Sequence, residues 1–251
     1  MFLSKRAFLG LLLVSWFPFF VRAVQFYAAA NLSGIPQASM LAPSAETFRQ
    51  FLEQQQTFVF FVTVYVGAGL IANDRRANAL QIYLSKPLTR VEYIVGKLAI
   101  LMAFLLFVTW VPAVTLLLVQ IVFAGSVAFF RSHVLLFPAI TVFAVLETAM
   151  IAVAMLALSS LSSNSRHVGI LYATLVFFTQ AIYGVLLLVT RDTRLSFLSF
   201  SSNLDQVGNL IFRLPLPYDT PWPVSLLMIA ALVVVSALVL ERRVRGVEIV
   251  T

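Results

Sequence analysis

Long apolar runs separated by short polar connectors make up most of the chain. The runs that approach the length of a membrane span cover residues 7–30, 57–72, 91–123, 134–158, 168–189 and 222–240. About 20 consecutive apolar residues are needed for a helix to cross the hydrocarbon core of a bilayer. The runs are continuous and do not alternate with a period of two, which disfavours a barrel. The sequence therefore predicts an all-α integral membrane protein with six transmembrane helices.

The first apolar run has features of a signal peptide and of a retained helix. Lys5 and Arg6 precede a short apolar core, and the run of alanines at 28–30 resembles a cleavage site. Arg22 and Gln25 interrupt the core, however, and apolar residues resume after them. We expect an uncleaved first span.

The polar connector after the first span contains a helical pattern of its own. Residues 44–53 place Phe48, Phe51 and Leu52 on one side of a helix. This pattern runs directly into the second apolar run. We expect a helix that begins in the connector and continues into the second span.

Composition supports a membrane protein without a separate soluble domain. Hydrophobic residues make up 61% of the 251 residues, charged residues make up 11%, and the mean hydropathy is +0.98. Soluble domains carry about 25% charged residues. Six spans and their connectors account for the whole length, so we expect a single domain over residues 1–251. No soluble catalytic domain is predicted.

Candidate chemistry is sparse. The chain has no cysteine, which excludes disulfides, thiolate catalysis and cysteine metal sites. Its two histidines, His133 and His167, lie at span ends without metal-ligand spacing, so no metal is expected. No paired carboxylates or serine–histidine arrangement lies at one membrane depth, and we expect no catalytic residues.

The net charge of +7 reflects membrane orientation. Nucleic-acid binding is the other reading of a basic chain, but membrane proteins collect Lys and Arg in cytoplasmic loops. With a cytoplasmic N-terminus, the inner side holds eleven of the 17 Lys and Arg residues: Lys5, Arg6, Arg75, Arg76, Lys86, Arg90, Lys97, Arg166, Arg242, Arg243 and Arg245. We expect both termini to be cytoplasmic, as an even number of spans requires, and no nucleic-acid partner.

The connector between the second and third spans predicts an amphipathic surface helix from Asn73 to Ser85. Polar residues recur at spacings of four, three and four, and an apolar stripe lies beside them. The polar stripe is Asp74, Asn78, Gln81 and Ser85; the apolar stripe is Ala77, Leu80 and Leu84, with Tyr83 beside it. Arg75 and Arg76 would then lie near lipid headgroups.

A sharp stop and a new start follow this helix. Pro87 ends it, because proline cannot continue a helix. Thr89 and Glu92 form a capping box that opens the third span, and Pro112 predicts a kink within that span. The surface helix can be a mechanical lever or an ordinary interfacial anchor, and periodicity alone does not separate the two.

Residues 67–97, GAGLIANDRRANALQIYLSKPLTRVEYIVGK, resemble the signature of ABC type-2 exporter permeases. The matching positions are Leu84, Ser85, Pro87, Leu88, Thr89, Arg90, Gly96 and Lys97. The order of six spans with both termini inside extends the resemblance over nearly the whole chain. The chain differs from the family pattern at Asn73-Asp74, where glutamates are usual, and at Ala77-Asn78, where a Gly-Thr pair is usual.

The resemblance implies a permease subunit that pairs with a second permease subunit and with two separate ABC ATPase subunits. The surface helix would be the coupling helix seated on the ATPase, with contacts from Asp74, Arg75, Arg76, Asn78, Leu80, Gln81, Tyr83, Leu84, Ser85, Pro87 and Arg90. The chain lacks a GxxxxGK[ST] phosphate loop, so ATP and Mg²⁺ would bind the partner. It also implies the inner membrane of a prokaryote and transport by alternating access. A channel or assembly scaffold without an ATPase is the alternative.

Glu147 lies near the middle of the fourth span. An ionised carboxylate at that depth costs about 2.5 to 3.5 kcal/mol on insertion scales. It can belong to a substrate or proton pathway, or it can be a structural glutamate satisfied by a neighbour such as Gln180 or Tyr183.

Two further segments allow two interpretations each. The hydroxyl-rich turn Ser159–Ser165 can contact the ATPase or simply cap two helices. The connector of residues 190–221 is too apolar for a free loop. The family resemblance suggests short re-entrant helices there, and an amphipathic hairpin on the outer surface is the other possibility.

Overall fold

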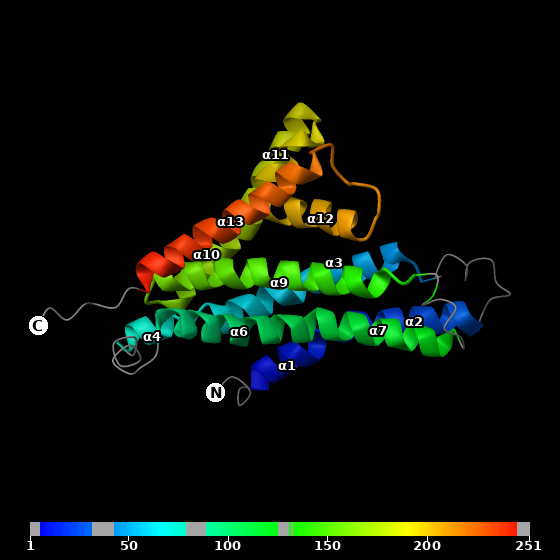
Figure 1. The fold of residues 1–251 in the computed structure, drawn as a ribbon, viewed down its shortest axis with the longest axis horizontal. Coiled ribbons are helices and arrows are strands. Elements are labelled where there is room, and N and C mark those ends of the chain that lie inside the picture. Colours follow the sequence, from blue (N-terminus) through cyan, green and yellow to red (C-terminus); the bar gives the residue numbers. More distant parts are fainter. Residues whose placement is uncertain (1–5, 32–42, 79–88, 125–130, 132, 245–251) are drawn as a thin grey trace, which may run out of the picture. The chain divides into compact units, whose positions relative to one another are not determined.

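The computed structural model describes residues 6–31, 43–78, 89–124, 131 and 133–244, and all regular secondary structure in them is helical (Figure 1). Among these residues, six helices are long and apolar enough to cross a membrane: Arg6–Asn31, Ala45–Arg76, Arg90–Phe123, Leu136–Leu161, Ser165–Thr190 and Trp222–Arg243. This confirms the predicted all-α chain with six apolar spans. The protein is a multi-pass membrane protein.

Several spans consist of more than one helical segment. The first contains α1 (Arg6–Val14) and α2 (Phe17–Asn31). The second contains α3 (Ala45–Val62), a π-helical turn η2 (Thr63–Gly67) and α4 (Ala72–Arg76). The third contains α6 (Arg90–Val108) and α7 (Trp110–Phe123), and the fourth is α9 (Leu136–Leu161).

The helical segments from Ser165 to Arg243 form the fifth span, two short helices and the sixth span. The fifth span contains α10 (Ser165–Ala173), a second π-helical turn η3 (Thr174–Phe178) and α11 (Thr179–Thr190). A 3₁₀ helix η4 (Thr193–Leu198) and α12 (Phe200–Ile211) precede the sixth span, α13 (Trp222–Arg243). The second span begins within the preceding connector, as the pattern of residues 44–53 predicts.

The chain forms two compact units. Unit 1 consists of Met1–Phe61, Leu105–Leu146 and Gly208–Pro215, and unit 2 of Val62–Phe104, Glu147–Val207 and Leu216–Thr251. Segments of the two units alternate along the chain, so no single boundary in the sequence separates them.

The core of unit 1 is rich in phenylalanine. Phe48, Phe51 and Leu52 of α3 are fully buried, which confirms the predicted apolar side of that helix. Ring centroids of Phe26 and Phe48 lie 5.7 Å apart. The buried cluster consists of Phe19, Phe26, Phe48, Phe51, Leu52, Ala113, Leu116, Leu117, Leu136, Ala139, Ile140, Phe143 and Phe212.

Arg49 lies inside this aromatic core with only 1% of its surface exposed. Its Nη2 is 3.3 Å from Glu53 Oε1, one turn further along α3. Its guanidinium carbon lies 4.7 Å from the centroid of the Phe143 ring. A buried guanidinium is stable only where an ion pair and favourable stacking replace its water. Sequence patterns gave no sign of this burial.

Gly208 of α12 completes the surroundings of Arg49. A Cβ at this position would lie 2.5 Å from Arg49 Nε and 2.8 Å from its guanidinium carbon. The guanidinium therefore packs directly on the backbone of α12. Three helical segments of unit 1 meet at one cation: α3, the first part of α9 and the last turn of α12.

Thr109 separates the two helices of the third span. Pro112 crowds the carbonyl group four residues earlier, at Val108, which is where α6 ends. The Thr109 hydroxyl donates to the Leu105 carbonyl at 2.9 Å. The break between the two helices lies at Thr109, three residues before Pro112, and the predicted kink itself stays a prediction.

The connector of residues 190–221 contains two short helices, η4 and α12. In unit 2, Gln206 Nε2 donates to the Thr220 carbonyl at 2.6 Å and to the Tyr218 carbonyl at 3.1 Å. Thr193 Oγ1 donates to Asp219 Oδ2 at 2.6 Å. These bonds hold the segment before α13 against η4 and α12, so this connector is an ordered structure.

Gly208→Ala tests the contact between α12 and Arg49. We expect thermal unfolding in detergent to occur several degrees lower, because overpacking in a core costs about 1–3 kcal/mol. Gly184→Ala in α11 is the matched control, since a Cβ at Gly184 meets nothing within 4 Å. Equal unfolding temperatures for the two variants would contradict the contact.

Candidate functional site at the junction of the second, third and fourth spans

The predicted surface helix begins as expected and is then interrupted. Of Asn73–Ser85, the structure describes Asn73–Asn78, and α4 ends at Arg76. Asn78 has a φ of 50°, and its N–H bonds to the Arg75 carbonyl at 3.2 Å. The prediction of one continuous helix is therefore wrong at Ala77 and Asn78. Asparagine tolerates the left-handed region better than most residues, and a residue in that region ends a helix.

The predicted contacts beyond this turn lie outside the described residues. They are Leu80, Gln81, Tyr83, Leu84, Ser85 and Pro87. Their assignment to the ATPase interface stays a prediction.

Ser159, near the end of α9, organises the start of α4 within unit 2. Its Oγ accepts hydrogen bonds from the N–H groups of Ile71 at 3.1 Å and Ala72 at 3.0 Å. The same hydroxyl donates to the Ala68 carbonyl at 3.0 Å. The first N–H groups of a helix lack partners in their own helix. A fully buried serine of the fourth span supplies them here.

Asp74 links α4 to the first turns of α6. Lys97 Nζ lies 2.6 Å from Asp74 Oδ2, and the Tyr93 hydroxyl donates to the same oxygen at 2.8 Å. The Asp74 and Lys97 side chains are only 18% and 19% exposed. Partial burial reduces solvent screening, so this pair contributes more than a surface ion pair. We call Asp74, Tyr93 and Lys97 the acidic clamp.

The sequence pattern places Asp74 in the polar stripe and Lys97 in the motif, but it does not pair them. Tyr93 and Lys97 are four residues apart and therefore lie on one face of α6. That spacing is the feature of the sequence that indicates a shared partner for Tyr93 and Lys97. Nothing in the sequence pattern indicated which acid, 19 and 23 residues away, would meet them.

Arg75 joins α4 to the fourth span a second time. Its Nη1 donates to the carbonyl of Ser160, the residue after the serine that caps α4. Arg76, Asn78 and Arg90 are exposed. The predicted site therefore has a fixed side, Asp74 and Arg75, and an accessible side that a partner can touch.

The third span begins at the predicted capping box. Thr89 N–H donates to Glu92 Oε2 at 2.8 Å, and Glu92 N–H donates to Thr89 Oγ1 at 3.3 Å. This reciprocal pair is confirmed. It fixes the first residue of α6 at Arg90.

The hydroxyl-rich turn acts as a helix cap. Asn164 Oδ1 accepts from the Arg166 N–H at 3.0 Å and starts α10. Together with the contacts of Ser159, this confirms the capping interpretation. An additional ATPase contact at this turn stays a prediction.

Glu147 is fully buried in the unit 2 part of α9. It interacts electrostatically with Tyr172, a buried residue that no sequence pattern marks. Gln180 Oε1 accepts from the hydroxyls of Ser199 and Ser202. A substrate could reach Glu147 only after surrounding side chains move, and a role in a substrate pathway stays a prediction.

The described residues form no cluster of metal-binding side chains. No three His, Asp or Glu side chains among those residues lie close enough together to hold an ion.

A double-mutant cycle tests the acidic clamp. We expect Asp74→Asn and Lys97→Met each to lower the unfolding temperature in detergent by a few degrees, because each leaves a partly buried charge without its ion pair. The double variant should cost little more than either single one, since residues in one network are not additive. Arg76→Ala, on the exposed side, is the control and should change little. Strictly additive losses would refute the pairing.

Comparison with known proteins adds no support for the resemblance to ABC type-2 permeases. No protein-family model matches the chain, and no curated protein matches it at a significant level. The likeness to ABC type-2 permeases is carried by residues 67–97 and by the order of the spans.

Proposed function

We propose that this chain is the membrane-spanning permease subunit of an ATP-driven exporter of the ABC type-2 class. The observation that supports the proposal most directly is the junction around α4. The short helix α4, which lies within the family-like segment of residues 67–97 at the end of the second span, is held to the third and fourth spans by the acidic clamp and Ser159. A helix that only anchors the chain at the membrane surface needs no such set of bonds.

The junction provides a route for force. Movement of an ATPase subunit would act on Arg76, Asn78, Arg90 and the segment that carries Leu80, Gln81, Tyr83, Leu84, Ser85 and Pro87. Asp74 would pass the displacement to α6, and Arg75 and Ser159 would pass it to α9. Rigid-body displacement of spans is an established route to alternating access.

The partners supply what this chain lacks. ATP and Mg²⁺ would bind two separate ABC ATPase subunits, and a second permease subunit would complete the transport pathway. Both termini would be cytoplasmic and the complex would lie in the inner membrane of a prokaryote. The buried Glu147 would become part of the pathway when the spans move apart.

The helices η4 and α12 would re-enter the membrane from the outer side. Irregular backbone is tolerated at that depth only where protein groups satisfy it. Asn203 Nδ2 donates to the carbonyls of Phe197 at 2.8 Å and Ser199 at 2.7 Å, and Gln206 satisfies the carbonyl of Thr220. These side-chain bonds support insertion over the alternative of an amphipathic hairpin that rests on the outer membrane surface.

Co-purification from the native host in mild detergent tests the proposal. We expect the tagged wild-type chain to bring down an ABC ATPase, and a Leu80→Asp/Leu84→Asp variant to lose it, because two carboxylates disrupt an apolar seat. Leu216→Asp is the control, since Leu216 is an exposed leucine of a different connector. It should retain the ATPase.

The outcomes separate the two functional classes. Loss in the double variant alone supports both the permease assignment and the position of the coupling segment. Absence of any ATPase from the wild-type purification would overturn the assignment and favour a channel or scaffold.

A further inference from the structure

Glu147 is the only acidic residue that is buried among the residues that the structure describes, with 0% of its surface exposed. It is the twelfth of the 26 residues of α9, which places it near the middle of the fourth span. Ionisable residues at such a depth are rare in membrane proteins, and they commonly mark pathways for substrates or ions. The surroundings of Glu147 therefore indicate what kind of group this chain can hold inside the membrane.

Two further spans bring polar groups to Glu147 within unit 2. Tyr172 of the fifth span interacts electrostatically with Glu147 and also interacts with the side chain of Thr63 in the second span. Tyr172 is 1% exposed and Thr63 is fully buried. The second, fourth and fifth spans therefore meet at one carboxyl group, two hydroxyl groups and one aromatic ring. We call Glu147, Tyr172 and Thr63 the buried polar cluster.

Both π-helical turns of the described chain lie beside residues of this cluster. Thr63 is the first residue of η2, and η3 begins two residues after Tyr172. Gly169, nearly one turn before Tyr172, lets α10 approach η2 closely, since a Cβ there would lie 3.2 Å from Val64 Cγ1. π-helical turns are rare and frequently occur at functional sites. Ordinary core packing does not require two such departures from α-helical geometry in neighbouring spans.

The chemistry of the cluster fits a cation. A carboxylate attracts positive charge, hydroxyl oxygens accept hydrogen bonds from an ammonium group, and an aromatic ring attracts a cation to its face. Glu147 is the only charged residue among the 26 of α9, and most of the others are apolar. A ligand that combines one positive charge with apolar groups would therefore match both the cluster and its surroundings.

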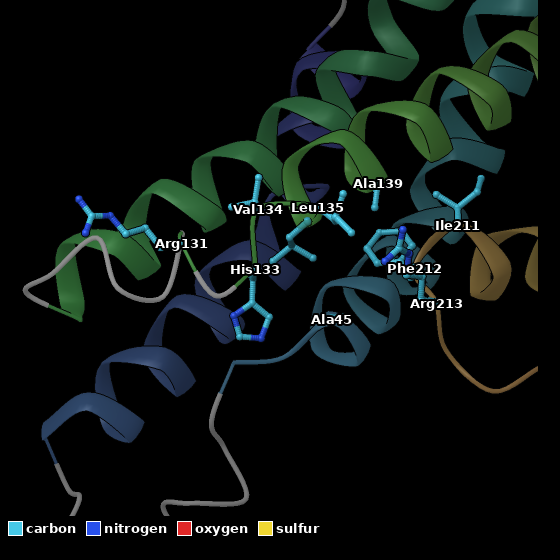
Figure 2. Close-up of a pocket in the computed structure, with 10 residues that line it drawn as sticks. Ala45, Arg131, His133, Val134, Leu135, Ala139, Ile211, Phe212 and Arg213 are labelled. Carbon is cyan, nitrogen blue, oxygen red and sulfur yellow. The ribbon is translucent and has the colours of Figure 1, made fainter.

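The cavity of about 330 Å³ in unit 1 does not offer such a site (Figure 2). Its titratable lining residues are Arg131, His133 and Arg213, and none of its described lining residues is acidic. Arg131 and Arg213 lie at opposite ends of the lining, so they do not converge on one ligand group either. The buried polar cluster is the better candidate for holding a charged ligand.

We propose that the buried polar cluster binds the positively charged group of the transported substrate, and that this substrate is an apolar organic cation. The inference rests on the proposed function, because the spans must move apart before a substrate can reach Glu147. It adds to that function the sign of the substrate's charge and the residues that recognise it.

Two ions of the same shape and opposite charge test the proposal: tetraphenylphosphonium and tetraphenylborate. Binding of each labelled ion is measured by equilibrium dialysis in neutral detergent, on the complex purified from the native host or on the chain alone if no ATPase co-purifies. Glu147→Gln removes the charge and keeps the shape of the side chain. We expect it to weaken tetraphenylphosphonium binding at least about tenfold, because opposite charges in apolar surroundings are little screened. Tetraphenylborate binding should not weaken.

Two variants are the controls for the loss of charge. Glu147→Asp keeps a carboxylate at the same place and should retain most of the tetraphenylphosphonium binding. Glu241→Gln removes an exposed carboxylate from the last turn of α13 and should change the binding of neither ion. Detergent without protein gives the background that is subtracted from each measurement.

The outcomes distinguish this inference from the proposed function. Unchanged tetraphenylphosphonium binding in Glu147→Gln, equal weakening of both ions, or no tetraphenylphosphonium binding by the wild type would each overturn the inference. None of these results depends on the ATPase, whose presence in the same preparation tests the proposed function. A chain that co-purifies with the ATPase but binds both ions regardless of Glu147 would keep the proposed function and remove the cation site.

Discussion

Backbone hydrogen bonding in apolar surroundings is the constraint on which the rest of this structure depends. Long helices satisfy their own peptide groups, but every break in a span exposes groups that lipid cannot satisfy. Polar side chains take over at one of these breaks and in the connector before the sixth span. Ser159 serves both sides of the gap before α4, Asn203 serves the residues around the start of α12, and Gln206 serves the segment before α13. Segments that are not helical are therefore held in place by side-chain hydrogen bonds to their backbone groups.

The described residues of the family-like segment 67–97 divide into two physical roles. Thr89 and Lys97 act within the chain, the first by starting α6 and the second by holding Asp74. Arg76 and Arg90 present their side chains to the surroundings. Some residues of this segment are thus bonded within the chain and others are exposed charges. Under the proposed function, the exposed charges would contact a partner and the bonded residues would pass its movement into the spans. The differences from the family at Ala77-Asn78 coincide with the left-handed turn that ends α4.

Features that depend on neighbouring residues in the chain could be predicted from the sequence. The spans, the capping box and the buried side of α3 all follow from local spacing. The contacts that depend on packing between distant segments could not. Arg49 looks like a surface charge until Phe143 and Gly208 enclose it, and the polar stripe runs through Asn78 without revealing its turn.

The third span has a length that matters for the bilayer itself. Its 34 residues would extend about 51 Å if straight, whereas the hydrocarbon core is about 30 Å thick. Tilting can take up part of this hydrophobic mismatch, and the rest of the helix must lie beyond the acyl chains. The turns that carry Tyr93 and Lys97 are the polar end of the helix, so we expect them to be the part outside the hydrocarbon. A thicker bilayer would draw them toward hydrocarbon, which makes membrane thickness a physical variable acting on the bond between Lys97 and Asp74.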